Sequence, residues 1–213
     1  MLRIGLIIGS TRPNRFADIP AQWIQDGARA VDAMSLEVLD LRDQHLSFYD
    51  EPVLQLYTGG AYKSIEAEAW RKKIAELDGY IVTVAEYNHS MTAVLKNAFD
   101  SAYYEWNRKP IAFVGYGGVG AARAIEQLRC VCIELHMAPI KPEVNIAMEP
   151  VLGVARAGKS LGDYSYLNDA RSLMFEHIVW WGAALKHARD TMKAPSFLPW
   201  GEKETDEIAG ASR

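Results

Sequence analysis

The chain has little of what marks exported, membrane-spanning or nucleic-acid-binding proteins. Only two of its 213 residues are cysteine, and 27 acidic residues outnumber 23 basic ones, for a formal net charge of −4. A nucleic-acid-binding surface is normally basic, so no nucleic-acid partner is expected. No apolar run approaches the roughly 20 residues of a membrane-spanning helix, so no membrane association is expected either. Strand-like sequence begins within three residues and leaves no room for a signal peptide, which predicts a cytoplasmic location.

The two cysteines, Cys130 and Cys132, indicate neither a disulfide nor a metal site. They lie two residues apart on a predicted helix and therefore point to different faces, which excludes a normal disulfide between them. Two cysteines do not make a zinc site, and no metal is expected. We interpret both as core or near-core thiols in a reducing compartment.

What the sequence does contain is an alternation of short apolar runs with helical patterns. The apolar runs predict strands at Ile4–Ile8, Leu36–Leu39, Tyr80–Val84, Ile111–Val114 and, more weakly, Val144–Ala147. The helical patterns predict helices over Asp18–Ala33, Ala61–Leu77, Thr92–Tyr104, Ala121–His136 and Asn168–Asp190. Five such units imply an α/β fold: a doubly wound, five-stranded parallel sheet with helices on both faces. A single sheet of this length favours the flavodoxin-like strand order 2-1-3-4-5.

Two stretches fall outside this alternation. Residues 41–60, with Pro52 and Gly59-Gly60, form a long connection that could fold over a ligand or against a partner subunit. From Thr191 onward, two prolines and a polar end predict a flexible C-terminal tail. We therefore expect one domain over residues 1–190 and a tail over residues 191–213.

The most informative stretch is Gly9-Ser10-Thr11-Arg12-Pro13-Asn14-Arg15, between the first predicted strand and the first predicted helix. Backbone N–H groups and the positive end of the helix dipole converge at such a position. The hydroxyls of Ser10 and Thr11 and the guanidinium groups of Arg12 and Arg15 add donors that suit an oxyanion. The stretch lacks both the Gly-Lys-Ser/Thr ending of a P-loop and the glycine spacing of a dinucleotide turn. It predicts a site for one terminal phosphate.

Two later loops should meet the first at the carboxyl edge of the sheet. Glu86-Tyr87-Asn88-His89-Ser90 follows the third predicted strand, and Tyr116-Gly117-Gly118-Val119-Gly120 follows the fourth, where glycines allow close backbone approach. A planar ring between these loops, with its phosphate on the first, describes flavin mononucleotide (FMN). Gly115, Gly117 and Gly120 also match the dinucleotide pattern G-x-G-x-x-G. That fingerprint normally opens the first βαβ unit, whereas here only one strand follows.

On these motifs the chain resembles the NADPH-dependent FMN reductases, a flavodoxin-like family that includes quinone, chromate and azo-dye reductases. The resemblance covers about residues 2 to 147 and rests on the first loop, on the Glu86–Ser90 motif with Leu95-Lys96-Asn97-Ala98 after it, and on Tyr116-Gly117-Gly118. One departure is Ala85, where the family usually has proline. Alanine leaves that turn freer and keeps an N–H group.

The resemblance implies a set of flavin contacts in the three loops. Ser10, Arg12 and Arg15 would hold the FMN phosphate, together with main-chain N–H groups of the loop from Thr11 through Phe16. Glu86, Tyr87, Asn88 and His89 would border the isoalloxazine ring, and Tyr116, Gly117 and Gly118 would contact its pyrimidine side. NADPH or NADH would supply a hydride that passes through the flavin to a flavin, quinone or similar small acceptor. No side chain need then act as a nucleophile or an obligatory proton donor.

The resemblance also implies a homodimer or homotetramer, for which residues 41–60 and the Trp180-Trp181 pair are the candidate contacts. Two other functions stay open at this point. An FMN electron carrier of the flavodoxin type would lack direct NAD(P)H oxidation, although flavodoxins tend to be more acidic and to have a hydroxyl- and glycine-rich phosphate loop. A protein that binds a phosphate ester or nucleotide without any flavin is the third possibility.

Overall fold

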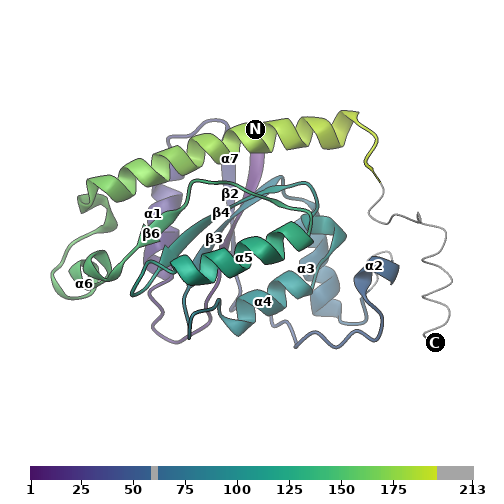
Figure 1. Ribbon diagram of the computed structural model, residues 1–213, viewed down its shortest axis with the longest axis horizontal. Coiled ribbons are helices and arrows are strands. Elements are labelled where there is room, and N and C mark those ends of the chain that lie inside the picture. The colour runs from purple at the N-terminus through teal and green to yellow at the C-terminus, as the bar shows by residue number, and fades with distance from the viewer. Residues whose placement is uncertain (59–61, 196–213) are drawn as a thin grey trace.

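The computed structural model describes residues 1–58 and 62–195 as a parallel sheet with helices on both faces (Figure 1). The strands are β1 (Leu2–Ile8), β2 (Met34–Asp40), β3 (Gly79–Ala85), β4 (Pro110–Tyr116), β5 (Ala138–Pro139) and β6 (Val144–Ile146). The α-helices are α1 (Asp18–Ala28), α2 (Gln55–Thr58), α3 (Ile65–Ala75), α4 (Ala93–Asp100), α5 (Ala122–Glu134), α6 (Met148–Arg156) and α7 (Ser165–Thr191). Two short 3-10 turns, η1 (Tyr104–Trp106) and η2 (Leu161–Asp163), complete the described elements.

The strand order is β2-β1-β3-β4-β5, with β6 also paired to β4 and all pairs parallel. This confirms the flavodoxin-like order 2-1-3-4-5. The fifth position is occupied by two short strands in succession. Pro139 and Pro142 fall in this stretch and have no N–H to donate, which restricts them to an edge position and interrupts the pairing.

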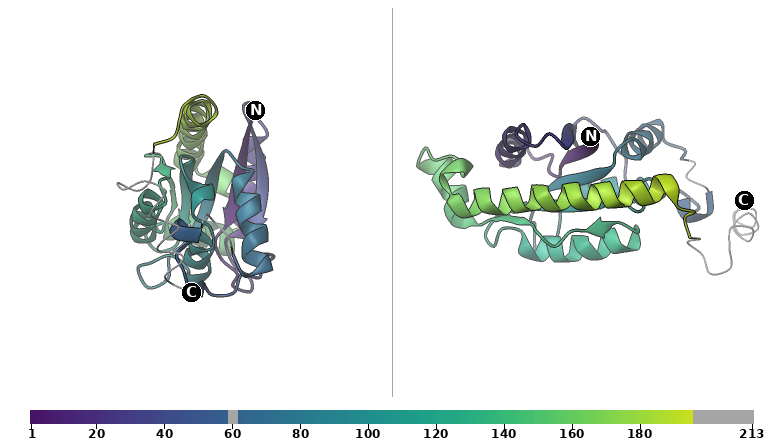
Figure 2. Two further views of the ribbon diagram at one scale, coloured as in Figure 1. Left: turned by 90° about the vertical axis from the view of Figure 1, so that its right-hand side faces the viewer. Right: turned by 90° about the horizontal axis from the view of Figure 1, so that it is seen from above.

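The strand periodicity of two divides the core between the two faces of the sheet. On β1, Ile4 and Leu6 point toward the layer of α1 and α7, where Ile24 and Ile178 also lie. Ile7 points the other way, into the layer of α3, α4 and α5. Figure 2 shows these two helical layers on opposite sides of the strands. The carboxyl ends of β1, β3 and β4 are left free for the loops that follow them.

Several predicted boundaries differ from the structure. Helix α1 ends at Ala28, five residues before the predicted end, and α4 ends at Asp100 because the chain then turns so that Trp106 fills the core. Helices α2 and α6 were not predicted. Cys132 is buried, but the core or near-core prediction is wrong for Cys130, which is exposed.

Some predictions fall on residues outside the described ranges. They concern Gly59-Gly60, the start of the second predicted helix at Ala61 and the tail beyond Pro195. Within residues 1–58 and 62–195, no helix combines the length and the apolarity that crossing a bilayer requires.

Candidate functional site

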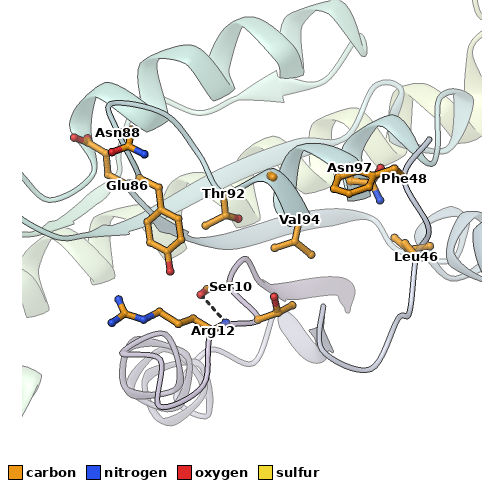
Figure 3. Close-up of a pocket in the computed structure, with 12 residues that line it drawn as sticks. Ser10, Arg12, Leu46, Phe48, Glu86, Asn88, Thr92, Val94 and Asn97 are labelled. Atoms are coloured by element: carbon orange, nitrogen blue, oxygen red, sulfur yellow. Dashed lines mark hydrogen bonds between the residues drawn. The ribbon is translucent and has the colours of Figure 1, made fainter. Parts of the chain in front are cut away.

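A cavity of about 800 Å³ opens at the carboxyl edge of the sheet, between the loops that follow β1 and β3 (Figure 3). Its walls come from four segments: Ser10, Thr11 and Arg12; Leu46 and Phe48; Glu86, Tyr87 and Asn88; and Thr92, Ala93, Val94 and Asn97. Figure 3 shows Ser10 and Arg12 on one side, Glu86 and Asn88 on another, and Leu46 and Phe48 near Asn97. The volume lies within the roughly 300–1,000 Å³ of ordinary ligand and cofactor pockets.

Gly9 fixes the first loop tightly against β3 and α4. Its N–H donates to the carbonyl and the hydroxyl oxygen of Thr83, both at 3.2 Å, and its carbonyl accepts from Thr92 Oγ1 at 2.6 Å. A Cβ atom at this position would lie 2.4 Å from the Thr83 carbonyl oxygen, closer than such atoms approach. Glycine is therefore required by this contact. Thr92 also caps α4, because its hydroxyl accepts the N–H of Leu95.

The two arginines of the first loop have different surroundings. The Arg15 side chain is only 2% exposed and donates to the Ser10 carbonyl at 2.5 Å, to Asp18 and to Asp40. Burial of Asp40 opposes its ionisation, but the hydrogen bonds from Arg15 and from the Arg42 N–H, together with the charges of both arginines, outweigh this and lower the Asp40 pKa. Arg12 is exposed, lines the cavity and has no ion-pair partner among the described residues. Arg15 thus holds the loop in shape, whereas the Arg12 charge is available to a ligand.

Ser10 and two aromatic rings form the base of the same loop. Ser10 is almost fully buried, and its Oγ accepts the Arg12 N–H at 3.4 Å. Burial raises the pKa of the Tyr116 phenol to about 12, with its hydrogen bond to Ser10 opposing that shift. The Phe16 ring packs 5.4 Å from the Tyr116 ring. Phe16 and Tyr116 therefore support the loop from behind the cavity wall.

The loop after β3 is a tight two-residue turn. Tyr87 and Ser90 exchange both backbone hydrogen bonds, at 2.8 and 3.0 Å, and the two residues between them have positive φ angles, 51° at Asn88 and 70° at His89. Two central residues with positive φ are the signature of the type I′ turn, a conformation that asparagine tolerates well. The turn follows directly on Ala85, the last residue of β3.

Helix α5 holds this turn through side chains that the sequence did not indicate. Arg123 forms an ion pair with Glu86 and approaches the His89 ring at 2.7 Å, and Gln127 donates to the His89 carbonyl at 2.9 Å. Burial would raise the pKa of Glu86, but the hydrogen bonds from Arg123 and from the Ala124 N–H outweigh it and lower the pKa. The one available signal was the i, i+4 spacing of Arg123 and Gln127, which places both on one helix face.

The third predicted loop, after β4, flanks the cavity at its Ser10 end rather than lining it. Gly115 is needed for packing, since a Cβ there would lie 2.2 Å from the Gly120 carbonyl oxygen. At Gly117, with φ 136°, a Cβ would have no atom within 4 Å, and at Gly118 the nearest would be Met148 Cε at 4.0 Å. These two glycines thus border open space into which a flat ligand could extend.

The connection after β2 forms the far wall. The Asn97 side chain donates to the Ser47 carbonyl at 2.8 Å and accepts the Tyr49 N–H at 3.0 Å. This double contact anchors the strip that carries Leu46 and Phe48 into the cavity wall. The prediction that this connection folds over the ligand site is consistent with its position.

Comparison with known proteins agrees with these motifs. Residues 2–150 match the model of the family described as NADPH-dependent FMN reductase. The chain is 34% identical over 152 residues to an NAD(P)H-dependent FMN reductase of Schizosaccharomyces pombe, covering 70% of this chain and 76% of the relative. It is 32% identical over 155 residues to a 2-hydroxy-1,4-benzoquinone reductase of a Burkholderia species, covering 68% and 78% of the two chains.

A solved structure shows the same fold. The flavoenzyme FerB of Paracoccus denitrificans, an NAD(P)H:(acceptor) oxidoreductase, superposes with a TM-score of 0.67 at 21% identity, covering 86% of this chain and 98% of FerB. The match of the family model extends over more than two thirds of the chain and includes the loops after β1, β3 and β4. The chain belongs to the NADPH-dependent FMN reductase family.

Proposed function

We propose that this reductase binds FMN at the carboxyl edge of its sheet, with the phosphate at Ser10 and Arg12. The ring would lie between the Tyr87–Ser90 turn and the glycines after β4. As a member of its family, the protein is an NAD(P)H-dependent reductase of the FMN reductase or quinone reductase type. The observation that carries the proposal is the cavity in which the first and second loops meet, with an uncompensated arginine at one end.

The charges around the cavity support an anion at the Ser10 end. Asp18 and Asp40 are both paired with Arg15. Glu86 is paired with Arg123. No carboxylate of residues 1–58 or 62–195 pairs with Arg12, which lines the cavity, and this free charge favours a phosphate.

Bound FMN would supply the redox chemistry, accepting a hydride from NAD(P)H and passing electrons to a second substrate. The protein's own contribution is to position the ring and to exclude water around it. Arg123 and Gln127 hold the turn that would border the ring, and Asn97 holds the opposite wall. The exposed rings of Phe48 (77% exposed) and Tyr87 (41%) lie at the cavity and offer apolar faces to a planar acceptor such as a quinone.

The test combines a visible spectrum with rapid kinetics. Purified protein supplied with FMN is expected to retain the flavin through gel filtration and to oxidise NADPH with menadione or free FMN as acceptor. Anaerobic stopped-flow mixing with NADPH should bleach the bound flavin directly, which distinguishes a reductase from a flavodoxin-type carrier. Retention of FMN without bleaching by NADPH or NADH would refute the reductase assignment for this site. Failure to retain FMN would refute the site itself.

We further propose that the protein is a homodimer or homotetramer. Two adjacent tryptophans of α7, Trp180 and Trp181, are 66% and 38% exposed, and aromatic residues are enriched in the cores of protein interfaces. Multi-angle light scattering of the FMN-loaded protein gives the mass directly. A monomer mass at every concentration measured would contradict this proposal.

A further inference from the structure

One side chain brings a full negative charge to the wall of the proposed flavin cavity. Glu86 is the only carboxylate among the described residues that line it (Figure 3). Its side chain is 6% exposed, so solvent screens this charge little. Burial would raise the Glu86 pKa, but the hydrogen bonds from Arg123 and from the Ala124 N–H lower it, so the group is ionised at neutral pH. A buried charge at this place acts on any molecule that the cavity holds.

The cation that balances Glu86 lies outside the cavity. Arg123 belongs to α5, is 45% exposed and does not line the cavity, but its Nε donates to Glu86 Oε1 at 2.6 Å. The Ala124 N–H donates to the other carboxylate oxygen at 3.4 Å. Glu86 follows β3, whereas Arg123 and Ala124 follow the glycine loop after β4. The ion pair therefore joins the two loops between which the ring would lie, and it fixes the carboxylate in place.

A second side chain of α5 holds the same turn without any charge. Gln127 donates to the His89 carbonyl at 2.9 Å and accepts the Ser90 hydroxyl at 2.8 Å. Arg123 and Gln127 are four residues apart, so they extend from one helix face to one turn. Both residues thus position the turn, whereas only Arg123 also balances the charge of Glu86. This difference allows position and charge to be tested separately.

We propose that Arg123 is a positioning residue that sets the reduction potential of the bound flavin, by holding Glu86 in place and balancing its charge. A flavin gains negative charge when it is reduced, and charged groups near its ring tune its electronics. An unbalanced Glu86 carboxylate would disfavour the reduced form, whereas the ion pair largely cancels this effect. The inference rests on the flavin site proposed above and concerns the electrostatics of that site.

Dye-equilibration potentiometry of the FMN-loaded protein tests the proposal, at about pH 8 to keep Glu86 ionised in the variants. Arg123→Ala should bind reduced FMN about tenfold more weakly relative to oxidised FMN, the order expected for one unit charge at a partly buried site. For a two-electron couple this ratio lowers the potential by about 30 mV. Glu86→Gln should shift the potential upward and by less, because Arg123 is 45% exposed and its charge is screened. Arg123→Lys keeps the charge and should change the ratio less than about twofold.

Two further variants separate charge from position. Gln127→Ala loosens the same turn without changing its charge, so it should weaken FMN binding and leave the potential unchanged. Arg123→Ala combined with Glu86→Gln removes both charges and should return the potential toward the wild-type value. Opposite shifts in the two single variants cannot come from a loosening of the turn that both share.

The outcomes distinguish the tuning from the flavin site itself. If wild type retains FMN but Arg123→Ala shifts the potential no more than Gln127→Ala does, Arg123 only holds the turn, and the tuning is wrong while the flavin site stands. If wild type retains no FMN, both proposals are wrong. If Arg123→Ala fails to fold, Glu86→Gln decides, and an unchanged or lowered potential in that variant overturns the tuning.

Discussion

Removing the Arg15 guanidinium should mainly lower the stability of the fold, because Arg15 bonds to the protein's own loop and carboxylates. In the Arg15→Ala variant, Asp40 keeps its place at the end of β2, with a side chain only 20% exposed, but loses its cation. Removing one partner of a buried ion pair typically costs 3–5 kcal/mol. Because Asp40 retains some solvent contact and Asp18 is half exposed, we expect the free energy of unfolding to fall by about 3 kcal/mol, at the lower end of this range. Urea unfolding of the flavin-free protein at pH 7 measures it.

The pH dependence of this effect gives a sharper test. In wild type the Asp40 pKa is lowered, so its stabilising contribution is present above the unfolded-state value of about 3.9 and is lost as the pH falls through the folded-state pKa. In Arg15→Ala, burial without a cation should raise the Asp40 pKa instead. The destabilisation is then present above that raised pKa and disappears as the pH falls below about 3.9. The difference in the free energy of unfolding between wild type and Arg15→Ala should therefore become smaller from pH 7 toward pH 4.

Two further variants complete this experiment. Arg15→Ala combined with Asp40→Asn should recover part of the loss, because no unpaired carboxylate is then buried. Arg42→Ala is the matched control: Arg42 is 36% exposed and lies 3.7 Å from Asp18, and exposed pairs contribute about 0–1 kcal/mol. If Arg15→Ala unfolds within about 0.5 kcal/mol of wild type, or if the difference does not change with pH, the assigned role of Arg15 is wrong.

Three other predictions concern contacts around the cavity. Gly9→Ala should lower the free energy of unfolding by about 1–3 kcal/mol and weaken FMN binding, because the new Cβ would meet the Thr83 carbonyl oxygen. Gly118→Ala is the control and should be tolerated, so equal unfolding midpoints for the two variants would contradict the close approach at Gly9. Arg123→Ala should raise the pKa of Glu86 and lower the free energy of unfolding by about 1 kcal/mol, a small loss because Arg123 is 45% exposed. If NMR shows an unchanged titration of Glu86, the ion pair is not what lowers its pKa. Asn97→Ala removes two hydrogen bonds to the strip that carries Leu46 and Phe48. It should raise the KM for a quinone with little change in the rate at which NADPH bleaches the flavin. If the steady-state and stopped-flow rates fall together, Asn97 affects more than the quinone side of the cavity.

The order of elements could be predicted from the sequence because it depends on local periodicity. The continuous apolar run at Ile4–Ile8 and the polar loop after it are both visible in the chain, and the structure has β1 over Leu2–Ile8 with the cavity beside that loop. Where elements end depends on tertiary packing, as at α4, which stops so that Trp106 can enter the core. Local patterns could not indicate these ends.

The pairing of side chains was beyond prediction for the same reason. Arg12 and Arg15 look alike in the sequence, but in the structure Arg15 is paired with Asp18 and with Asp40, 25 residues away, whereas Arg12 is left available. The contact between Glu86 and Arg123 joins residues 37 apart and depends on how α5 packs beside β3. Sequence alone indicates which residue types are present in a loop, but their charge balance is decided by neighbours from other elements.

The central claim is that the FMN phosphate binds at Ser10 and Arg12, and comparing FMN with riboflavin, which lacks the phosphate, tests it most directly. Fluorescence titration should give both dissociation constants for wild type and for Arg12→Ala. A charge-assisted hydrogen bond contributes about 1.5–3 kcal/mol, so Arg12→Ala should weaken FMN binding roughly ten- to hundredfold. Riboflavin binding should change less than about twofold, since it makes no phosphate contact. If Arg12→Ala leaves FMN affinity unchanged, or weakens both flavins equally, the phosphate does not bind at this end of the cavity.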